Sequence, residues 1–549
     1  MIPGSANPLL LKSAAAAGGY QVSRSLRFNS SDSGFCSRTP AVAGNRRTWT
    51  WAGWVKRSAL GGRQFIITGN VNADANYWEF DSSNKLHVSG NDGTSQAWDF
   101  TTTQVFRDVS SWYHLVITFN STEATTGDRV KIYINGSRII NFDYSGYPVL
   151  NYETFFNQAV EHDIGSAGGA GLYLNGYLAD IHFIDGQALT PSSFTEVSAT
   201  TGQLIPKAYS GTFGTNGFWL KFSDNSAATA ATLGKDYSGN SNNWTPNNLS
   251  VTAGAGNDSL VDTPTSFGTD TYVGGEVRGN YATLNPLQLS NSNRITLSNG
   301  NLQGAGNSVY YGSAISTIAV NSGKWYAEFT FTLASTIPFA GIIKTNPLDS
   351  AYQNTDDQLL GRTANGYGYR SNQQLYNNNS ISTYGASWTD GDAIGVALDL
   401  DAGTLTFYKN GVSQGQAASG LSGYYAIGCS VYSSAVCNAN FGQRAFAYPA
   451  PSGFKALCDT NLPEGTITTS GTYTGNGVAD GPFVYLNGVP TAMTVGGNAV
   501  TFGTHADKLS NGFKLRTTST TYNQNALSYN YSITATGAKF KYARAQPNP

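Results

Sequence analysis

The hydrophobic pattern of the chain is dominated by two consecutive apolar runs, at residues 112–119 and 130–134, with a polar loop between them. The second run, Val-Lys-Ile-Tyr-Ile, alternates apolar and polar residues, which is the period of a strand with one buried face. The first run is apolar on both faces and therefore predicts a strand covered on both sides, as in a stack of two sheets. Asn135-Gly136 follows the second run and predicts a tight hairpin turn, because both positions tolerate positive φ.

The same pattern recurs in the second half of the chain. Trp388 precedes a period-two run at 394–400 and a further strand that ends at Asn410-Gly411. The separation from Trp to Asn is nearly the same in the two copies. Two shorter apolar runs, at 172–176 and 484–488, end in the same Asn-Gly pair. The repetition predicts at least two β-sandwiches built on one plan.

Other apolar runs follow one another at intervals of roughly a dozen residues, which is typical of a sandwich. In the run 48–55, Trp49 and Trp51 share one face with Val55, whereas Trp54 lies on the other, so we expect cover on both faces. The run 323–331 again places its large apolar residues on one face. These patterns predict an all-β chain of tandem antiparallel β-sandwiches with a small C-terminal β module.

Composition supports this prediction and limits the classes of molecule that the chain is expected to bind. Only 12% of the 549 residues are charged, 13% are aromatic, and there are 63 Gly, 32 Tyr and 2 Met. Such a chain suits many short strands and turns, with a neutral surface that fits sugars or proteins. The net charge of −2 gives no electrostatic footprint for nucleic acid, and no apolar run predicts membrane insertion or a signal peptide.

The composition also changes along the chain, which predicts five segments. Residues 1–20 read as an N-terminal docking arm or a flexible leader, 21–224 as the first sandwich, 225–290 as an extended polar linker, 291–465 as the second sandwich and 466–549 as the C-terminal module.

Four cysteines are unevenly spread and form no Cys-x-x-Cys motif, so we expect small buried hydrophobic residues; they are Cys36, Cys429, Cys437 and Cys458.

Two family resemblances follow from motifs in the sandwich segments. Four motifs between residues 51 and 181 resemble the laminin-G-like, concanavalin-A-like lectin family. In order they are Trp-x-x-Trp-Val, Trp-Tyr-His-Leu-Val-Ile-Thr-Phe, Ile-Tyr-Ile-Asn-Gly and Gly-Tyr-Leu-Ala-Asp-Ile. That family implies a jelly-roll sandwich. Three motifs in the second sandwich segment are similar to the SPRY (B30.2-like) family. They are Gly-Lys-Trp-Tyr-Ala-Glu-Phe at 323–329, Leu-Thr-Phe-Tyr-Lys-Asn-Gly at 405–411 and Asn-Phe-Gly-Gln at 440–443. Its bent β-sandwich recognises proteins or peptides and is not known for catalysis.

The combination of these units with the opening Met-Ile-Pro-Gly-Ser-Ala-Asn-Pro and the closing Phe-Lys-Tyr-Ala-Arg resembles tail-fibre and adhesin proteins of tailed bacteriophages. By analogy this implies a location on the virion, at the tail or capsid surface, after synthesis in the host cytoplasm. The partners would be other virion proteins and a host cell-surface glycan or protein. A homo-oligomer is expected, with a trimer as one candidate. The alternatives are a structural virion component and, with less support, a glycan-degrading enzyme.

Catalytic motifs are absent from the sequence. There is no Gly-x-Ser-x-Gly, no His-Glu-x-x-His and no phosphate loop, so we expect no catalytic residues. Glu79 and Asp81 share a strand face, and a glycanase needs two carboxylates, but Asp and Glu are also common at strand ends. The local cluster 161–163 (Glu-His-Asp) and His114 read as structural positions.

Calcium is the one cofactor for which candidates exist. Several laminin-G-like domains hold Ca²⁺ at the sandwich rim, and the resemblance therefore makes candidates of Asp74, Asn76, Asp92 and Asp128. None of them falls in a diagnostic spacing, and ordinary turn residues are the alternative.

A ligand or partner face is expected in the second sandwich. Four tyrosines near Trp388 lie in an Asn/Gln-rich stretch, and they are Tyr367, Tyr369, Tyr376 and Tyr384. Aromatic rings pack on the C–H surfaces of sugars, which makes these residues ligand-binding candidates. The alternative is that half of them belong to the core.

Overall fold

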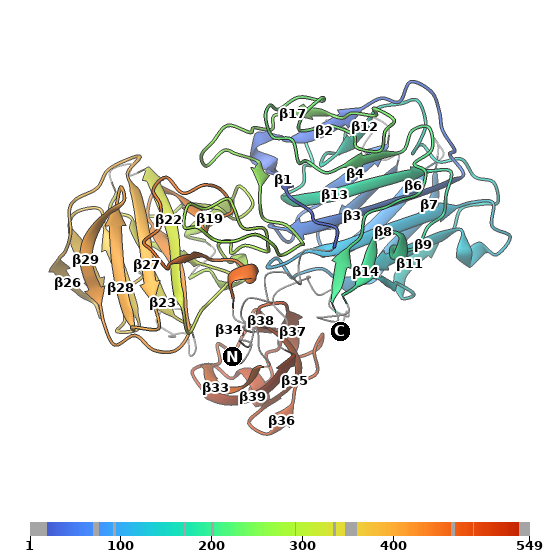
Figure 1. The fold of residues 1–549 in the computed structure, drawn as a ribbon. Coiled ribbons are helices and arrows are strands. Elements are labelled where there is room, and N and C mark those ends of the chain that lie inside the picture. Colours follow the sequence, from blue (N-terminus) through green and yellow to red (C-terminus); the bar gives the residue numbers. More distant parts are fainter. Residues whose placement is uncertain are drawn as a thin grey trace, which may run out of the picture.

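The computed structural model describes residues 19–69, 76–91, 95–168, 171–198, 203–290, 293–332, 336–345, 359–462, 467–486 and 488–536. These residues form an all-β protein of antiparallel sheets, as the pattern predicted (Figure 1). The single α-helix within these ranges is the short α2 (Thr520–Asn523). No helix in this part of the chain has the length and apolar character needed to cross a membrane.

The first sandwich consists of two eight-stranded sheets. Sheet 1 has the order β10-β9-β8-β3-β13-β1-β18 with β16 beside β13, and its strands are β1 (Ser25–Phe28), β3 (Thr48–Arg57), β8 (Tyr113–Asn120), β9 (Val130–Ile134), β10 (Ser137–Arg138), β13 (Gly176–Asp185), β16 (Phe218–Leu220) and β18 (Ser259–Leu260).

Sheet 2 has the order β11-β7-β6-β5-β4-β12-β2-β17, and its strands are β2 (Phe35–Arg38), β4 (Gln64–Gly69), β5 (Asn76–Phe80), β6 (Lys85–Asn91), β7 (Gln96–Val105), β11 (Phe142–Gly146), β12 (His162–Ile164) and β17 (Thr245–Asn247). A separate ribbon pairs β14 (Thr195–Val197) with β15 (Leu204–Pro206).

The core between sheets 1 and 2 confirms the predicted strand faces. Trp49 and Trp51 point into it, where the ring of Trp49 stacks on Phe119 at 5.1 Å between centroids. Trp54 points to the opposite face of β3 and is buried there as well, so both faces are covered. The turn between β9 and β10 is the predicted one, with Asn135 and Gly136 at φ values of 50° and 81°.

The second sandwich repeats this plan. Sheet 3 has the order β19-β20-β31-β22-β27-β28-β29 with β32 beside β22, and its strands are β19 (Ile295–Ser298), β20 (Gln303–Gly306), β22 (Lys324–Thr332), β27 (Ala393–Asp399), β28 (Thr404–Lys409), β29 (Val412–Ala418), β31 (Val436–Asn440) and β32 (Lys455–Ala456).

Sheet 4 has the order β21-β30-β23-β24-β25-β26, and its strands are β21 (Gly312–Ile315), β23 (Phe339–Lys344), β24 (Gly366–Arg370), β25 (Gln374–Asn377), β26 (Ser380–Thr383) and β30 (Tyr425–Val431). The apolar face of β22 and the period-two run of β27 fill the space between sheets 3 and 4. Asn410 and Gly411 form the second predicted turn, at φ values of 49° and 77°.

The C-terminal module has a core of its own between two small sheets. One sheet has the order β33-β39-β35-β36 and the other β34-β38-β37, formed by β33 (Ile467–Thr474), β34 (Phe483–Tyr485), β35 (Val489–Val495), β36 (Asn498–Ala499), β37 (Ala506–Leu509), β38 (Gly512–Leu515) and β39 (Ser528–Thr536). This agrees with the β module expected there.

The segment 225–290 differs from the extended linker that its polar composition predicts. Its strands β17 and β18 pair with β2 and β1 of the first sandwich, and Trp244 lies in the core of that sandwich. Many of its polar side chains are buried and hydrogen-bonded, such as Asp258, which accepts from Arg27 Nε at 3.1 Å. Polar residues that satisfy one another inside a fold produce the same composition as a solvated linker.

Buried polar contacts join the first sandwich to the segment 225–290 and to the second sandwich. Lys56 of β3 donates to Asp262 at 2.7 Å, and the Asp262 carboxylate also accepts from Trp112 Nε1 at 3.2 Å. Both partners of this ion pair are almost fully buried. A turn at 299–301 inserts from the other side, where the Tyr177 hydroxyl donates to the Gly300 carbonyl at 2.6 Å.

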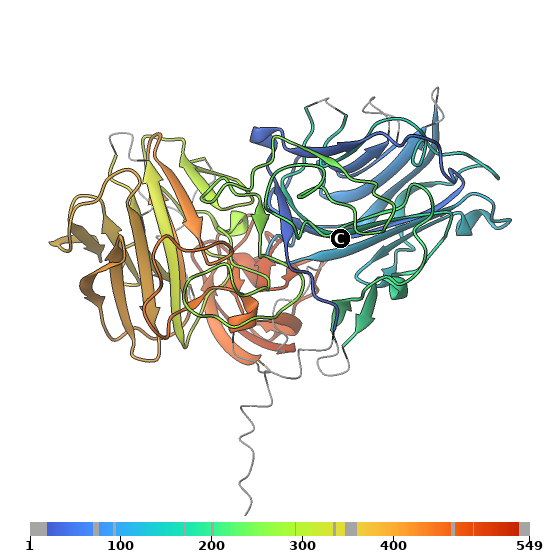
Figure 2. The same ribbon diagram turned by 45° about the horizontal axis from the view of Figure 1, so that its top comes forward.

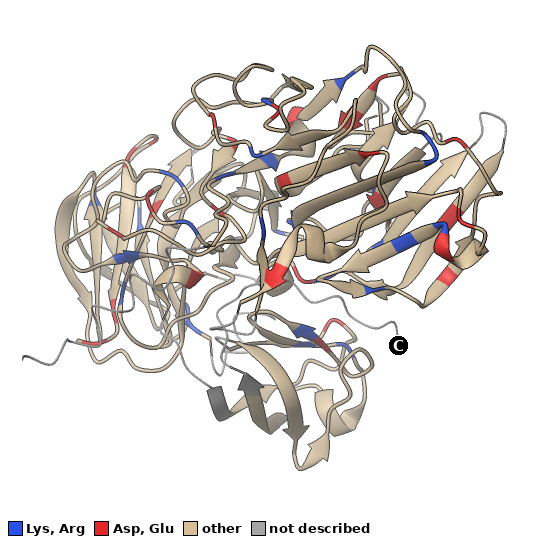
Figure 3. Ribbon diagram, turned by 45° about the vertical axis from the view of Figure 1, so that its right-hand side comes forward, with Lys and Arg blue, Asp and Glu red and all other residues tan. Residues whose placement is uncertain are grey.

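The C-terminal module contacts both the first sandwich and the connecting segment. Arg107 and Arg516 both donate to the buried carboxylate of Asp507, and Asp108 accepts from the backbone of Ser510 at 2.8 Å. Lys514 donates to the carbonyl of Leu287 at 2.9 Å. Figure 2 shows the module against the junction of the two sandwiches, so the three bodies form one assembly. Charged residues are sparse and of mixed sign along the ribbon (Figure 3).

Candidate ligand-binding site

A cluster of charged side chains lies on the outer face of sheet 2. Trp78 and Phe80 of β5 point into the core, so the alternate residue Glu79 points outward. Glu79 stands opposite His87 of β6, and Asp99 lies on the neighbouring strand β7. Arg63 precedes β4 and completes the cluster, which therefore draws on four consecutive parts of the sheet.

Hydrogen bonds link the four side chains in a row. Arg63 donates to Glu79 through two nitrogens, with Nε to Oε2 at 2.7 Å and Nη2 to Oε1 at 3.0 Å. His87 Nδ1 lies 3.1 Å from Glu79 Oε1, and its Nε2 lies 2.6 Å from Asp99 Oδ1. A carboxylate only accepts, so both imidazole nitrogens donate when the ring is protonated. Positive and negative groups alternate along the row.

The carboxylates control the charge of His87. Burial alone would lower its pKa, but the hydrogen bonds and charges of Asp99 and Glu79 outweigh burial and raise the pKa to about 9. His87 is therefore charged at neutral pH, and the four groups sum to zero. Side-chain exposure is 39% for Arg63, 18% for His87 and 14% for Asp99, whereas Glu79 is buried at 2%. Three members of the cluster thus reach solvent.

The two carboxylates that share this strand face, Glu79 and Asp81, are both engaged in hydrogen bonds within the fold. Both oxygens of Glu79 accept hydrogen bonds, from the two nitrogens of Arg63 and, at Oε1, also from His87. Asp81, which follows Glu79 by two residues, accepts from the backbone N–H groups of Ser83 and Lys85, each at 2.8 Å. The exposed groups of Arg63, His87 and Asp99 can form hydrogen bonds with the hydroxyl groups of a sugar. The Tyr77 ring, 5.3 Å from His87, is buried and therefore offers no exposed face to such a ligand.

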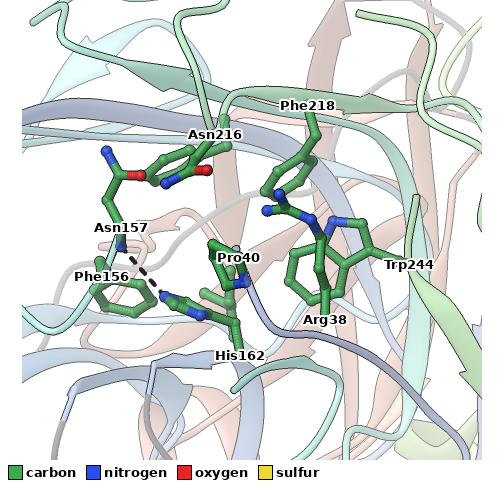
Figure 4. Close-up of a pocket in the computed structure, with 10 residues that line it drawn as sticks. Arg38, Pro40, Phe156, Asn157, His162, Asn216, Phe218 and Trp244 are labelled. Carbon is green, nitrogen blue, oxygen red and sulfur yellow. Dashed lines mark hydrogen bonds between the residues drawn. The ribbon is translucent and has the colours of Figure 1, made fainter. Parts of the chain in front are cut away.

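A small pocket lies elsewhere in the first sandwich, around His162 (Figure 4). His162 Nδ1 donates to the Val160 carbonyl at 2.7 Å, and its Nε2 accepts from the backbone of Asn157 at 3.2 Å. Burial lowers the pKa of His162 to about 4, so the ring is neutral. The cavity measures about 20 Å³, which is room for one water molecule. It is too small for a saccharide, in line with the structural role expected for residues 161–163.

His114 also occupies the structural position expected from the sequence. It is buried on β8, and its ring lies 4.8 Å from that of Trp54.

The four tyrosines expected to form a ligand face lie in different places. Tyr369 is fully buried between sheets 3 and 4, 5.4 Å from the ring of Phe407. Tyr376 is 7% exposed and packs on the other face of sheet 4, and Tyr384 is half-buried with its hydroxyl donating to the Gly415 carbonyl at 2.6 Å. Tyr367 is half-buried. Sheet 4 is covered on both faces around Tyr369 and Tyr376, so the four rings do not form one exposed surface.

The calcium candidates are not assembled into a site by the described residues. Asp74 and Asp92 lie outside them. Asn76 is buried at the start of β5, and Asp128 forms ion pairs with Lys131 at 3.2 Å and Arg138 at 3.7 Å. Within the ranges that the structure describes, no group of three or more His, Cys, Asp or Glu residues could hold a metal ion. The four cysteines are free and buried.

The sequence pattern pointed to Glu79 as a strand-face carboxylate, but it did not predict the partners of Glu79, which are Arg63, His87 and Asp99. A signal was present, because His87 and Asp99 each occupy the polar position of an alternating run, Leu-His-Val and Trp-Asp-Phe. Alternation assigned them to an outer face. It could not show that neighbouring strands bring them together, because that depends on register.

Comparison with known protein families identifies two domains. Residues 29–194 match the model of the concanavalin A-like lectin/glucanases superfamily, and residues 348–444 match the model of the SPRY domain. Among curated proteins, the chain is 31% identical over 153 residues to the E3 ubiquitin-protein ligase RKP of Arabidopsis thaliana and 28% identical over 158 residues to the ATP-dependent RNA helicase DDX1 of Xenopus laevis. These alignments cover 27% and 28% of this chain, but only 11% and 20% of those proteins.

Two solved structures with a local likeness are SPRY domains. The SPRY domain of human HERC1 is 21% identical with a TM-score of 0.24, covering 28% of this chain and 96% of that one. The TRIM65 PSpry domain is 16% identical with a TM-score of 0.25, covering 29% and 89%. The family matches and the sheets described above agree: the chain contains a concanavalin A-like lectin domain followed by an SPRY domain.

Proposed function

We propose that this chain is a non-enzymatic binding protein of a tailed-phage virion that attaches to a glycan or protein of the host surface. Its two domain types suggest a role in binding and protein interaction. The observation that carries the proposal is the Arg63–Glu79–His87–Asp99 row, which exposes hydrogen-bonding groups while its buried carboxylate is fully engaged.

The virion assignment rests on sequence resemblance. The opening Met-Ile-Pro-Gly-Ser-Ala-Asn-Pro and the closing Phe-Lys-Tyr-Ala-Arg support it, together with the order of the two domains. Both terminal segments lie outside the described residues. The proposed partners are other virion proteins and the host receptor.

Competition for adsorption tests the proposal. Purified chain should block attachment of the phage to its host, and Asp99→Asn together with His87→Gln should weaken the block, because these changes remove exposed charges of the row. Asp128→Asn, a change at an exposed ion pair away from sheet 2, is the matched control and should block as well as the parent chain. Purified chain that leaves adsorption unchanged would refute an attachment role.

Two other functions give different results. A structural virion component would be located by electron microscopy at the capsid or baseplate, whereas an adhesin would be found at a distal tail position. A glycan-degrading enzyme would release new reducing ends from host polysaccharide. The bidentate pairing of Glu79 with Arg63, together with its bond to His87, argues against a role of this carboxylate as a catalytic acid.

A further inference from the structure

The end of the SPRY-containing sandwich that is farthest from the other two bodies carries two free sheet edges. Sheet 4 ends there with β26 and sheet 3 with β29, both at the left of Figure 1. The residues around these strands, 371–388 and 410–424, include no Asp, Glu, Lys or Arg. Each edge also exposes a large apolar side chain, Ile381 at 50% and Val412 at 65%. Natural proteins usually protect such edges with charge, proline or bulges.

Only one of the two edges has regular geometry. The pairing of β29 with β28 is irregular at two points, which twists that edge. The pairing of β26 with β25 is regular from Asn377 opposite Ser380 to Gln374 opposite Thr383. A regular, uncharged edge is the better template for another strand.

The hairpin geometry shows which main-chain groups are free on β26. Asn378 and Asn379 form the two-residue loop, with φ values of 50° and 56°. In such a hairpin the residues that flank the loop exchange both hydrogen bonds, so Ser380 and then Ser382 point their main-chain groups toward β25. The main-chain N–H and C=O groups of Ile381 and Thr383 therefore point outward from the sheet.

We propose that β26 is an interface between two copies of this chain, in which the two β26 strands pair antiparallel about a two-fold axis at Ile381. Residues directly opposite in an antiparallel pair share one face, so the axis must pass through a residue position. Centred on Ile381, it sets Ser380 opposite Ser382 of the second copy. Ile381 then exchanges both hydrogen bonds with its own counterpart, and its exposed side chain is covered by an identical one.

Charge favours a second copy over a charged partner. Like charges directly opposite one another destabilise strand pairing, and this edge has none to oppose its copy. The same absence of charge gives a nucleic acid or an acidic peptide nothing to attract it. Pairing of two β26 strands does not involve the host ligand, so its test is independent of the test of the proposed function.

Cross-linking tests the register. In a hydrogen-bonded antiparallel pair the Cα atoms are about 5.5 Å apart, within the range of a disulfide. Oxidised Ile381→Cys should therefore form covalent dimers of the full chain. Thr383→Cys is the matched control on the same strand, because the axis at Ile381 places its two copies about 14 Å apart. The four natural cysteines are buried as thiols and do not compete. Equal cross-linking of both variants, or of neither, would overturn the proposal.

Mass measurement tests the interface without oxidation. Sedimentation of the parent chain over a concentration series should show self-association that Ile381→Lys weakens by about tenfold or more, since two lysines would then meet at the axis. Val412→Lys, on the neighbouring irregular edge, should leave the association unchanged. A parent chain that is monomeric throughout, or an oligomer that Ile381→Lys does not alter, would contradict this interface. In that case strands of another protein become the candidate occupant.

Discussion

At the scale of single residues, His87 links the candidate site to stability. The pKa of His87 is about 9 in the folded chain and about 6.5 when unfolded. A raised pKa contributes stability that is complete below about pH 6.5 and is lost as the pH rises toward 9. The free energy of unfolding should therefore fall across this window, by up to about 3 kcal/mol. Urea denaturation at a series of pH values measures it.

The control for this prediction is His87→Gln, because other groups titrate in the same range. Burial lowers the pKa of Lys514 to about 8, so its effect on stability has the opposite sign as the pH rises. The difference between the parent chain and His87→Gln isolates the His87 contribution. If the difference in unfolding free energy between the parent chain and His87→Gln stays constant from pH 6 to 9, Glu79 and Asp99 do not stabilise the protonated form of His87.

Gly300 lies in the turn by which the second sandwich contacts the first. Its φ is +64°, and a Cβ would lie 2.2 Å from the Tyr177 hydroxyl. Gly300→Ala should destabilise the chain by about 3 kcal/mol, from left-handed strain plus the clash. Gly420→Ala, at φ +68° with open space around it, should cost only about 1 kcal/mol. Equal melting temperatures for the two variants would contradict the inserted turn.

At the scale of strands, alternation predicted which residues share a face in β3, β9, β22 and β27. It could not sort the tyrosines of sheet 4. Tyr369 and Tyr376 lie on opposite faces, and both faces are covered, the outer one partly by Leu359. Period-two patterns distinguish the two faces of a strand, but they do not show whether the second face is exposed to solvent.

Tyr376→Ala tests this difference between packing and ligand contact. The ring lies 6.0 Å from that of Phe339, and the hydroxyl donates to Asn379 at 2.6 Å. Removing the ring should leave a cavity and cost about 3 kcal/mol, whereas Tyr376→Phe should cost about 1 kcal/mol for the lost hydrogen bond. Thermal denaturation of both variants gives these values. If Tyr376→Ala leaves the melting temperature unchanged, the Tyr376 ring is not part of the packed core and becomes a candidate ligand contact again.

At the scale of the whole molecule, the three bodies are joined by contacts that the sequence could not reveal. Lys56 and Asp262 are far apart in the chain, and neither belongs to a motif. The composition of 225–290 indicated a solvated linker because a buried polar network and an exposed segment use the same residue types. Long-range pairing, rather than local pattern, decides between them.

The Lys56–Asp262 pair should be essential for holding the segment 225–290 on the first sandwich. Lys56→Met would leave a buried carboxylate without its cation and should cost about 3–5 kcal/mol. Calorimetry should show a lower melting temperature for the joined sandwiches. Arg47→Met, which removes an ion pair whose two side chains are nearly half exposed, should have little effect. Equal effects of the two changes would show that the buried ion pair does not hold the segment 225–290 in place.

The central claim is that the chain holds its ligand without cutting it. The most direct measurement incubates the full chain with immobilised polysaccharides from the host surface and records retained protein and released reducing ends in the same wells. We expect saturable retention that His87→Gln and Asp99→Asn weaken, with no reducing ends released. Reducing ends that accumulate with the parent chain would contradict the claim.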